Sequence, residues 1–153
     1  MKPRQITDPK EIKSVLDAVD CCYVSMVTPE GSPYVVPMNF GYDEEYIYLH
    51  SSRIGKKIDI LRHNPEVCIA FSAFHELRYQ SEKVACSWSM KYKSILVYGK
   101  VEFVEEPEVK VEMLNAMMRK YAGRDFTYSA PALREVLTYR VKIEKIEGRA
   151  YRY

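Results

Sequence analysis

Residues 34–61 of this 153-residue chain, YVVPMNFGYDEEYIYLHSSRIGKKIDIL, decide its fold class. Residues 34–40 and 46–51 are rich in β-branched and aromatic side chains, and a turn-forming segment at 41–45 separates them. Pro37 interrupts the first run, and because proline cannot donate to a sheet ladder, this strand is expected at an edge or a bulge. The short connection predicts antiparallel strands, since a parallel pair needs a long crossover.

Toward the N-terminus, residues 22–27 form another strand-like run that ends in the turn sequence 28–31. Three runs joined by two short turns predict an antiparallel meander. A helix precedes them, because Asp8, Pro9 and Glu11 fit the N-cap, first and third positions of a capping box. This helix is expected to stop near Asp20, and its apolar face comprises Ile12, Val15, Leu16 and Val19.

Toward the C-terminus, strands and helices continue to alternate. A short helix is predicted from about 52 to 63, with Ile54, Ile58 and Leu61 on its buried side. Further strands are predicted at 67–74, 94–104 and 137–146, a helix opens at Glu106-Pro107 with Gly123 as C-cap, and 124–131 is expected to be a loop. About six strands with flanking helices favour a closed or nearly closed small barrel, and the length predicts one domain, residues 1–153.

Composition and charge narrow the range of functions. The chain has 23 basic and 21 acidic side chains, a formal net charge of +2, and 47% hydrophobic residues. This balance supports a buried core and gives no long-range field to attract nucleic acid or an anionic membrane. The N-terminus lacks the apolar stretch of a signal peptide, and no run reaches the roughly 18 apolar residues of a membrane span, so a cytoplasmic location is expected.

The cysteines predict neither disulfides nor a metal centre. A cytoplasmic compartment keeps thiols reduced. No C-x-x-C pair occurs, and none of the three histidines has ligand spacing to a cysteine. Cys68 and Cys86 fall in strand-like segments and are expected to be buried as small apolar residues. The other two cysteines are Cys21 and Cys22.

The strand at 46–51 runs directly into the start of a helix, which suits a phosphate group. A helix N-terminus offers unpaired backbone N–H groups and a partial positive charge. A serine can cap the helix or donate to phosphate oxygens, a glycine permits close approach, and two lysines supply counter-charge. These residues are Ser51, Ser52, Gly55, Lys56 and Lys57. A capped, solvated helix start accounts for them without a ligand.

Two other stretches can contact a planar ligand. Residues 86–99, CSWSMKYKSILVYG, place the only tryptophan, Trp88, beside hydroxyl and amine side chains. Pro37, in the run 37–40, leaves nearby backbone groups free to meet the edge of a heterocycle. The simpler alternatives are a buried tryptophan at a strand entry and an ordinary edge strand. No G-x-G-x-x-G, Walker, G-x-S-x-G or H-E-x-x-H motif occurs.

Taken together and in this order, three stretches resemble the pyridoxamine 5′-phosphate oxidase-like flavin proteins. The stretches are YVVPMNFGYD (34–43), IYLHSSRIGKKIDILRHNP (47–65) and ACSWSMKYKSILVYGKVEFVEEPEVK (85–110). They are most similar to the 5-nitroimidazole-resistance (Nim-type) branch. The resemblance runs from about Thr7 to Gly123, and the tail 124–153 matches only as a final strand. It implies a six-stranded antiparallel split β-barrel, a homodimer, and FMN at the dimer interface.

The resemblance also implies roles for individual residues. Backbone groups of Val36, Pro37, Met38 and Asn39 would meet the isoalloxazine ring. His50, Ser51, Lys56 and Lys57 would serve the phosphate and ribityl side. The residues that would close the site, some of them from the partner subunit, are Ser87, Trp88, Tyr92 and Ser94. His50 is the candidate catalytic residue that aids nitro reduction; the alternative is a partly buried histidine bonded to backbone.

The function that follows is an FMN-dependent oxidoreductase. Reduced FMN would pass a hydride or electrons to a small flat substrate such as a nitroaromatic, with NAD(P)H as a possible reductant. One alternative is a non-catalytic module that stores or senses flavin in the same pocket. Another is a haem-handling protein, because some related split barrels bind haem. The residues themselves leave these alternatives open.

Overall fold

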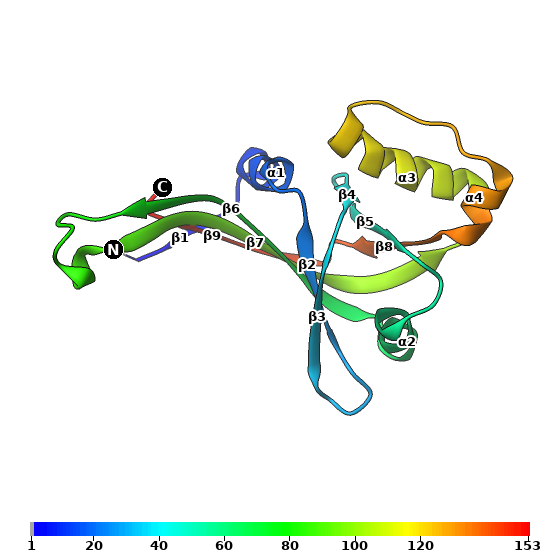
Figure 1. Cartoon of the computed structure of the whole chain (residues 1–153), viewed down its shortest axis with the longest axis horizontal. Helices are drawn as coiled ribbons and strands as arrows, with labels where there is room; N and C mark the ends of the chain where they lie inside the picture. The colour runs from blue at the N-terminus through cyan, green and yellow to red at the C-terminus, as the bar shows by residue number, and fades with distance from the viewer. Residues whose placement is uncertain (1) are drawn as a thin grey trace.

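The computed structural model describes residues 2–153, in which nine strands form one antiparallel sheet that curls on itself (Figure 1). The strands are β1 (Arg4–Ile6), β2 (Cys22–Val27), β3 (Pro33–Met38), β4 (Gly41–Tyr42), β5 (Tyr46–Ser51), β6 (Glu66–Arg78), β7 (Ser89–Val104), β8 (Leu137–Lys142) and β9 (Lys145–Tyr151). The flanking helices are α1 (Pro9–Ala18), α2 (Lys56–His63), α3 (Pro107–Ala122) and α4 (Ala130–Glu135). The predicted class, mainly β with flanking helices in a split barrel, is confirmed. The predicted number of six strands was too low.

The sixteen-residue strand β7 explains how the sheet closes. Residues 92–98 of β7 lie between β6 and β9, whereas residues 101–104 pair with β8 instead. The single final strand predicted at 137–146 is therefore two strands. Between them, the backbone N–H groups of Ile143 and Glu144 donate to the carbonyls of Glu45 (2.8 Å) and Tyr98 (3.0 Å), which carries the chain from one neighbour to the other.

The strand order is β3-β2-β6-β7-β8-β5-β4, with β9 paired to β7 and to β1. The predicted meander was wrong, because β3 pairs with β2 while β5 pairs with β8 and β4, so the second turn crosses the barrel. The edge position predicted from Pro37 is confirmed: β3 ends the order, and Pro37 stands opposite Tyr23. A proline at an edge leaves no inner ladder bond unmade.

The barrel interior is closely packed with apolar side chains. Phe40 and Phe71 meet edge to face with their ring centroids 4.9 Å apart, and Tyr139 is fully buried. Burial of apolar surface contributes about 25 cal/mol per Å² and is the main stabilising term. Gly99 is required where β7 crosses β8, because a Cβ there would lie 2.2 Å from the Lys142 carbonyl oxygen.

The N-terminal helix begins and packs as predicted, but its capping box does not form. The Asp8 side chain accepts from the Lys10 N–H at 2.9 Å, and Val15 and Leu16 are buried. Glu11 instead binds Arg4 (2.6 Å) and Lys93 (2.9 Å), joining α1 to β1 and β7. The helix ends at Ala18, two residues before the predicted end at Asp20.

The other helices modify the predictions. Helix α2 begins only at Lys56, so Ile54 lies in the preceding loop and is 87% exposed rather than buried. Gly123 is confirmed as the C-cap of α3, with φ 71°. Helix α4 occupies part of the segment predicted as a loop, where the Ser129 hydroxyl accepts from the Ala132 N–H at 3.2 Å. Cys86 is exposed and Cys68 half-buried, so the expected burial of both was wrong; Cys22 is the buried cysteine.

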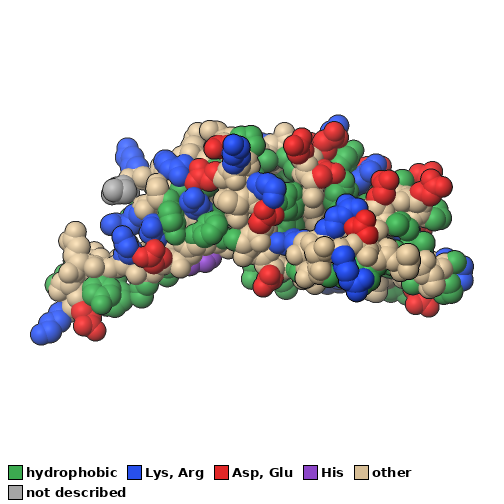
Figure 2. Space-filling view, turned by 90° about the horizontal axis from the view of Figure 1, so that it is seen from above, with side chains coloured by type: hydrophobic (Ala, Val, Ile, Leu, Met, Phe, Trp, Pro, Cys, Tyr) green, Lys and Arg blue, Asp and Glu red, His purple; other side chains and the backbone are tan. Residues whose placement is uncertain are grey.

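Strands β6 and β7 continue past the barrel as a projecting hairpin, the arm, which comprises residues 74–92 (Figures 1 and 2). The arm begins at an irregularity in the β6–β7 register, where Phe74 has φ 58°. Near its tip, a short 3₁₀ turn (Ala85–Ser87) precedes Trp88, whose ring stacks on Tyr79 at 4.2 Å between centroids. In residues 2–153 no helix has the length and apolarity required to cross a bilayer.

Candidate functional site

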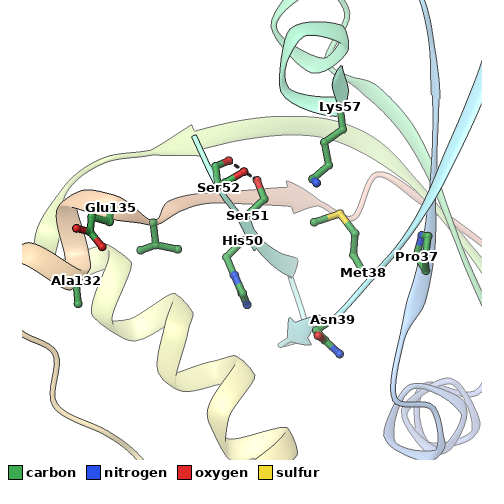
Figure 3. A pocket seen from close by; sticks show the side chains of 10 residues that line it. Pro37, Met38, Asn39, His50, Ser51, Ser52, Lys57, Ala132 and Glu135 are labelled. Carbon is green, nitrogen blue, oxygen red and sulfur yellow. Dashed lines mark hydrogen bonds between the residues drawn. The ribbon is translucent and has the colours of Figure 1, made fainter. Parts of the chain in front are cut away.

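A cavity of about 600 Å³ lies where β3 and β5 end and α2 and α4 begin to cover the barrel (Figure 3). Its lining combines backbone from an edge strand with two hydroxyls, an imidazole, an ammonium group and a carboxylate. The lining residues are Pro37, Met38, Asn39, His50, Ser51, Ser52, Lys57, Ala132, Glu135 and Val136. A volume in the range of roughly 300–1,000 Å³ and a few convergent polar groups are typical of small-molecule sites.

The β3 wall of the cavity is fixed from behind. The Asn39 side-chain amide donates to the Asp20 carbonyl at 3.1 Å and to the Tyr121 hydroxyl oxygen at 3.3 Å. The Tyr121 hydroxyl in turn donates to the Asp20 carbonyl at 2.6 Å. Met38 is held by the buried Tyr139, whose hydroxyl lies 3.8 Å from the Met38 sulfur. The wall is therefore positioned by contacts across the barrel.

The end of β5 supplies the polar centre of the cavity. Pairing of β5 with β8 sets His50 opposite Thr138 and Ser51 opposite Leu137. The Ser51 hydroxyl donates to the Ser52 carbonyl at 2.8 Å, and the Ser52 hydroxyl donates to the Ile54 carbonyl at 2.9 Å. Both oxygens retain lone pairs. His50 is exposed at the end of β5, and partial desolvation of its ring lowers the pKa of the imidazole below the usual value, which favours the neutral form at pH 7.

The start of α2 faces the cavity without a side-chain cap. Gly55 is the N-cap with φ 147°, and in residues 2–153 no side chain caps this helix. Of the two roles that the sequence offered Ser51 and Ser52, helix capping therefore does not occur. A Cβ on Gly55 would meet no atom of residues 2–153 within 4 Å, so the space before the helix is open. Lys57 lines the cavity, whereas the Lys56 ammonium lies over the Tyr34 ring, 4.7 Å from its centroid.

Sequence reasoning missed the wall formed by α4 and the start of β8. Lys110, 3% exposed, donates from Nζ to the carbonyls of Leu133 (2.6 Å) and Val136 (2.8 Å). Arg53 donates to the carbonyls of Arg134 (3.2 Å) and Val136 (3.1 Å) and pairs with Glu105. A signal was available, because Ser129-Ala130-Pro131 is a serine N-cap followed by proline in the first turn.

The cavity brings together seven of the residues expected to bind the cofactor. They are Pro37, Met38, Asn39, His50, Ser51, Ser52 and Lys57. Val36, Gly55 and Lys56 adjoin the cavity in sequence without lining it, and Val36 packs against the core.

Four expected site residues lie elsewhere in the same chain. The Ser87 hydroxyl oxygen lies 2.7 Å from each of the carbonyl oxygens of Ser81 and Val84 within the arm, and its single proton can be donated to either. Trp88 stacks on Tyr79 and donates to the Glu82 carbonyl at 3.2 Å. Tyr92 stacks on Tyr151, and Ser94 stands opposite Ser72 and Arg149. A contribution of these residues to a neighbouring subunit stays a prediction.

A second, wider groove lies between α1 and α3, on the face that Figure 2 shows. Its rim carries charges of both signs, several of which are engaged within the protein: Lys13 pairs with Asp17 at 2.6 Å, and Arg119 pairs with Asp125 at 2.5 Å. The cavity at α2 is the better candidate, because its lysine and serine oxygens converge on one space. In residues 2–153 no cluster of His, Cys, Asp and Glu side chains is suited to a metal ion.

Comparison with known proteins gives a match to a family model over most of the chain. Residues 8–150 match the model described as pyridoxamine 5′-phosphate oxidase. This match includes the C-terminal segment, where only a final strand was expected to fit. A search of curated proteins gives no match.

Solved structures agree with the family model. A candidate 5-nitroimidazole antibiotic resistance protein from Bacteroides thetaiotaomicron is 43% identical, with a TM-score of 0.88 over 97% of this chain and 87% of that one. An FAD-binding protein from Mesorhizobium loti is 25% identical, with a TM-score of 0.69 over 99% of both chains. An FAD- and haem-binding protein from Mycobacterium smegmatis is 17% identical, with a TM-score of 0.83 over 97% and 74%, and shows likeness of fold alone.

Proposed function

The chain belongs to the pyridoxamine 5′-phosphate oxidase family, and from that premise we propose that it is an FMN-dependent oxidoreductase acting on a small flat substrate such as a nitroaromatic. The observation that carries the proposal is the cavity in which Lys57, two serine oxygens and the uncapped start of α2 face the end of an edge strand. Flavin, when bound, would supply hydride or single-electron transfer.

The phosphate end of the cofactor fits the α2 side of the cavity. The first-turn N–H groups and the helix dipole favour an anion, and the open space before Gly55 lets one approach. Lys57 would supply the counter-charge, and Ser51 and Ser52 lie beside it. Lys56, held over Tyr34, would contribute little direct contact.

The flat part of the cofactor fits the β3 and β5 side. Pro37 at the sheet edge leaves neighbouring backbone groups free for a heterocycle, and Met38 and Asn39 are held by Tyr139 and Tyr121. The neutral His50 ring can donate one hydrogen bond and accept another at pH 7. These residues would orient the ring and a bound substrate and exclude water from one side.

A second copy of the chain would complete the site. The strand register aligns Pro37, Tyr23, Ala70 and Leu96 across the outer face of β3, β2, β6 and β7. Val35 on the same face is 59% exposed. An apolar sheet face of this kind is typical of an interface, and we propose that a homodimer covers it and brings the partner's Trp88, Tyr92 and Ser94 toward the flavin.

Purification of the protein and mass spectrometry of the released chromophore test the proposal. Bound FMN that bleaches with NAD(P)H and regains its colour with a nitroaromatic supports the oxidoreductase. FMN that no reductant bleaches supports a non-catalytic flavin-binding protein, and a Soret band supports haem binding. Protein that purifies without a chromophore and does not bind added FMN contradicts the cofactor assignment.

A further inference from the structure

Glu135 places a carboxylate in the cavity that an anionic cofactor does not explain. In Figure 3, Glu135 lies on the α4 side of the cavity and Lys57 on the α2 side, with His50 and the serines between them. A cavity that served a phosphate alone would be weakened by a carboxylate in its lining, because like charges repel. Glu135 therefore calls for a different partner.

The protein does not use this carboxylate for its own structure. The two cations of the α4 wall are engaged elsewhere, since Arg53 pairs with Glu105 and Lys110 lies 3.5 Å from Glu105 while both bind main-chain carbonyls. None of the ten ion pairs formed by residues 2–153 includes Glu135. No ion pair within residues 2–153 thus balances the charge of Glu135.

Helix stability does not explain Glu135 either. It is the last residue of α4, where the partial negative charge of the helix C-terminus disfavours a carboxylate. The backbone there is fixed by Lys110 and Arg53, which hold the carbonyls on both sides of Glu135. Lys110 and Arg53 thus fix the backbone of a segment whose acidic residue lines the cavity. The position of this residue at the helix C-terminus lowers the stability of α4 by a small amount.

We infer that Glu135 is a specificity-determining residue that favours substrates carrying a protonated amine or a similar cationic N–H donor. The inference rests on the proposed function and names the class of substrate for that same cavity. Lys57 would match the anionic end of the cofactor, and Glu135 would match a cationic group at the opposite end. Glu135 is exposed at the edge of the cavity, and a charge pair formed there would discriminate against neutral and anionic analogues of the same shape.

Three nitrobenzenes of similar size test this selection: 4-nitrobenzylamine, 4-nitrobenzyl alcohol and 4-nitrobenzoate carry charges of +1, 0 and −1 at pH 7. Their dissociation constants with the flavin-loaded protein are measured by quenching of flavin fluorescence and by calorimetry. The amine is expected to bind about fivefold more tightly than the alcohol, as one partly exposed charge pair provides. Glu135→Gln removes this difference, and Glu135→Lys makes the benzoate the preferred probe.

A matched control is Glu30→Gln on the exposed turn after β2, which changes the net charge equally but lies outside the cavity. This variant keeps the ranking of the unmodified protein. Equal binding of amine and alcohol by the unmodified protein, or an unchanged ranking in Glu135→Gln, overturns the inference. A protein that holds no flavin contradicts the proposed function but not the role of Glu135. Calorimetry on the flavin-free protein still measures the dissociation constants of the three probes and so tests Glu135 by itself.

Discussion

The cavity end of the barrel, at the ends of the six-residue strands β3 and β5, and the arm, formed by the longer strands β6 and β7, hold their side chains in different ways. Around the cavity, Asn39, Met38 and the α4 wall are fixed by residues distant in sequence, such as Tyr121, Tyr139 and Lys110. In the arm, the base contacts the C-terminal residues, as in the Tyr92–Tyr151 stack, but the contacts near the tip are local, such as the Tyr79–Trp88 stack. Large apolar side chains there stay exposed: Leu77, Tyr79, Val84, Trp88 and Met90.

This difference shows what each region requires. The cavity is organised by the fold of one chain, so its geometry exists before any ligand binds. The arm places apolar side chains outside the barrel, and several of them stay exposed in the described chain. A partner surface is the expected complement of the arm, whereas a small molecule is the expected complement of the cavity.

The largest expected effect separates the two adjacent lysines at the cavity. Lys57→Glu should weaken FMN binding about 100-fold, because it replaces the counter-charge of the phosphate by a repelling one. Lys56→Glu, which alters a side chain over Tyr34, should weaken binding by less than about threefold, as expected of an exposed charge. Fluorescence titration with FMN measures both variants. Equal losses would show that the phosphate does not lie beside Lys57.

The next largest effect compares how a lysine substitution changes the free energy of unfolding at the cavity and in the arm. Lys110→Met should lower the free energy of unfolding by about 2–3 kcal/mol, because two carbonyls of the α4 segment lose a charged donor. Lys83→Met, at the exposed tip of the arm, should change it by less than about 0.5 kcal/mol. Urea denaturation checks both values. A Lys110 variant as stable as the parent would mean that the hydrogen bonds from Lys110 do not stabilise the α4 segment.

A smaller effect concerns assembly. Trp88→Ala should leave the free energy of unfolding of the barrel within about 1 kcal/mol of the parent yet raise the dimer dissociation constant about tenfold, as loss of an aromatic interface anchor does. Sedimentation at several protein concentrations gives the dissociation constant, with Lys83→Ala on the same hairpin as the control. An unchanged dimer dissociation constant would show that Trp88 of the arm does not contribute to the dimer interface.

The smallest effect lies where the two regions join. Arg4 and Lys93 bind Glu11 and lower the pKa of its carboxyl to about 2, below its usual value of about 4.5. The stabilisation that these two ion pairs give to the folded state is complete above pH 4.5. It is lost as the pH falls from 4.5 toward 2, because the Glu11 carboxylate becomes protonated. Glu11→Gln should lower the free energy of unfolding by about 1 kcal/mol at pH 7 and flatten its fall between pH 4.5 and 2, measured by thermal melts. A variant whose melting temperature falls as steeply as the parent's would contradict this role.

Local patterns in the sequence were sufficient for several elements. Asp8 and Pro9 begin α1 because the cap and the fixed proline φ act within one turn. Gly123 ends α3 because the left-handed conformation there suits glycine. Pro37 marks an edge strand because its missing N–H is a property of the residue itself. The lysines after β5 and the residues 37–39 were likewise visible, because each pattern is continuous in the chain.

Other features depended on contacts between distant segments. Glu11 fits a capping box in sequence, yet Arg4 and Lys93 bind it once β1 and β7 are placed beside α1. Lys56 and Lys57 are equivalent in the sequence, and only the position of Tyr34 assigns one to an aromatic ring and leaves the other to the cavity. The meander was wrong because register and partner choice depend on long-range pairing, which turn length does not specify.

The sequence alone determined the class of the fold, the caps and breaks of its helices, the family resemblance and most of the residues that line the cavity. Each of these follows from interactions within a few residues or from a contiguous motif. The tertiary structure alone decided how β5 crosses to β8, why α4 forms the far wall, and that Glu135 and Lys57 line opposite sides of the same cavity. Those features depend on strand pairing, ion pairs and hydrogen bonds to main-chain carbonyls between residues remote in sequence. No local sequence pattern specifies which of these remote residues meet.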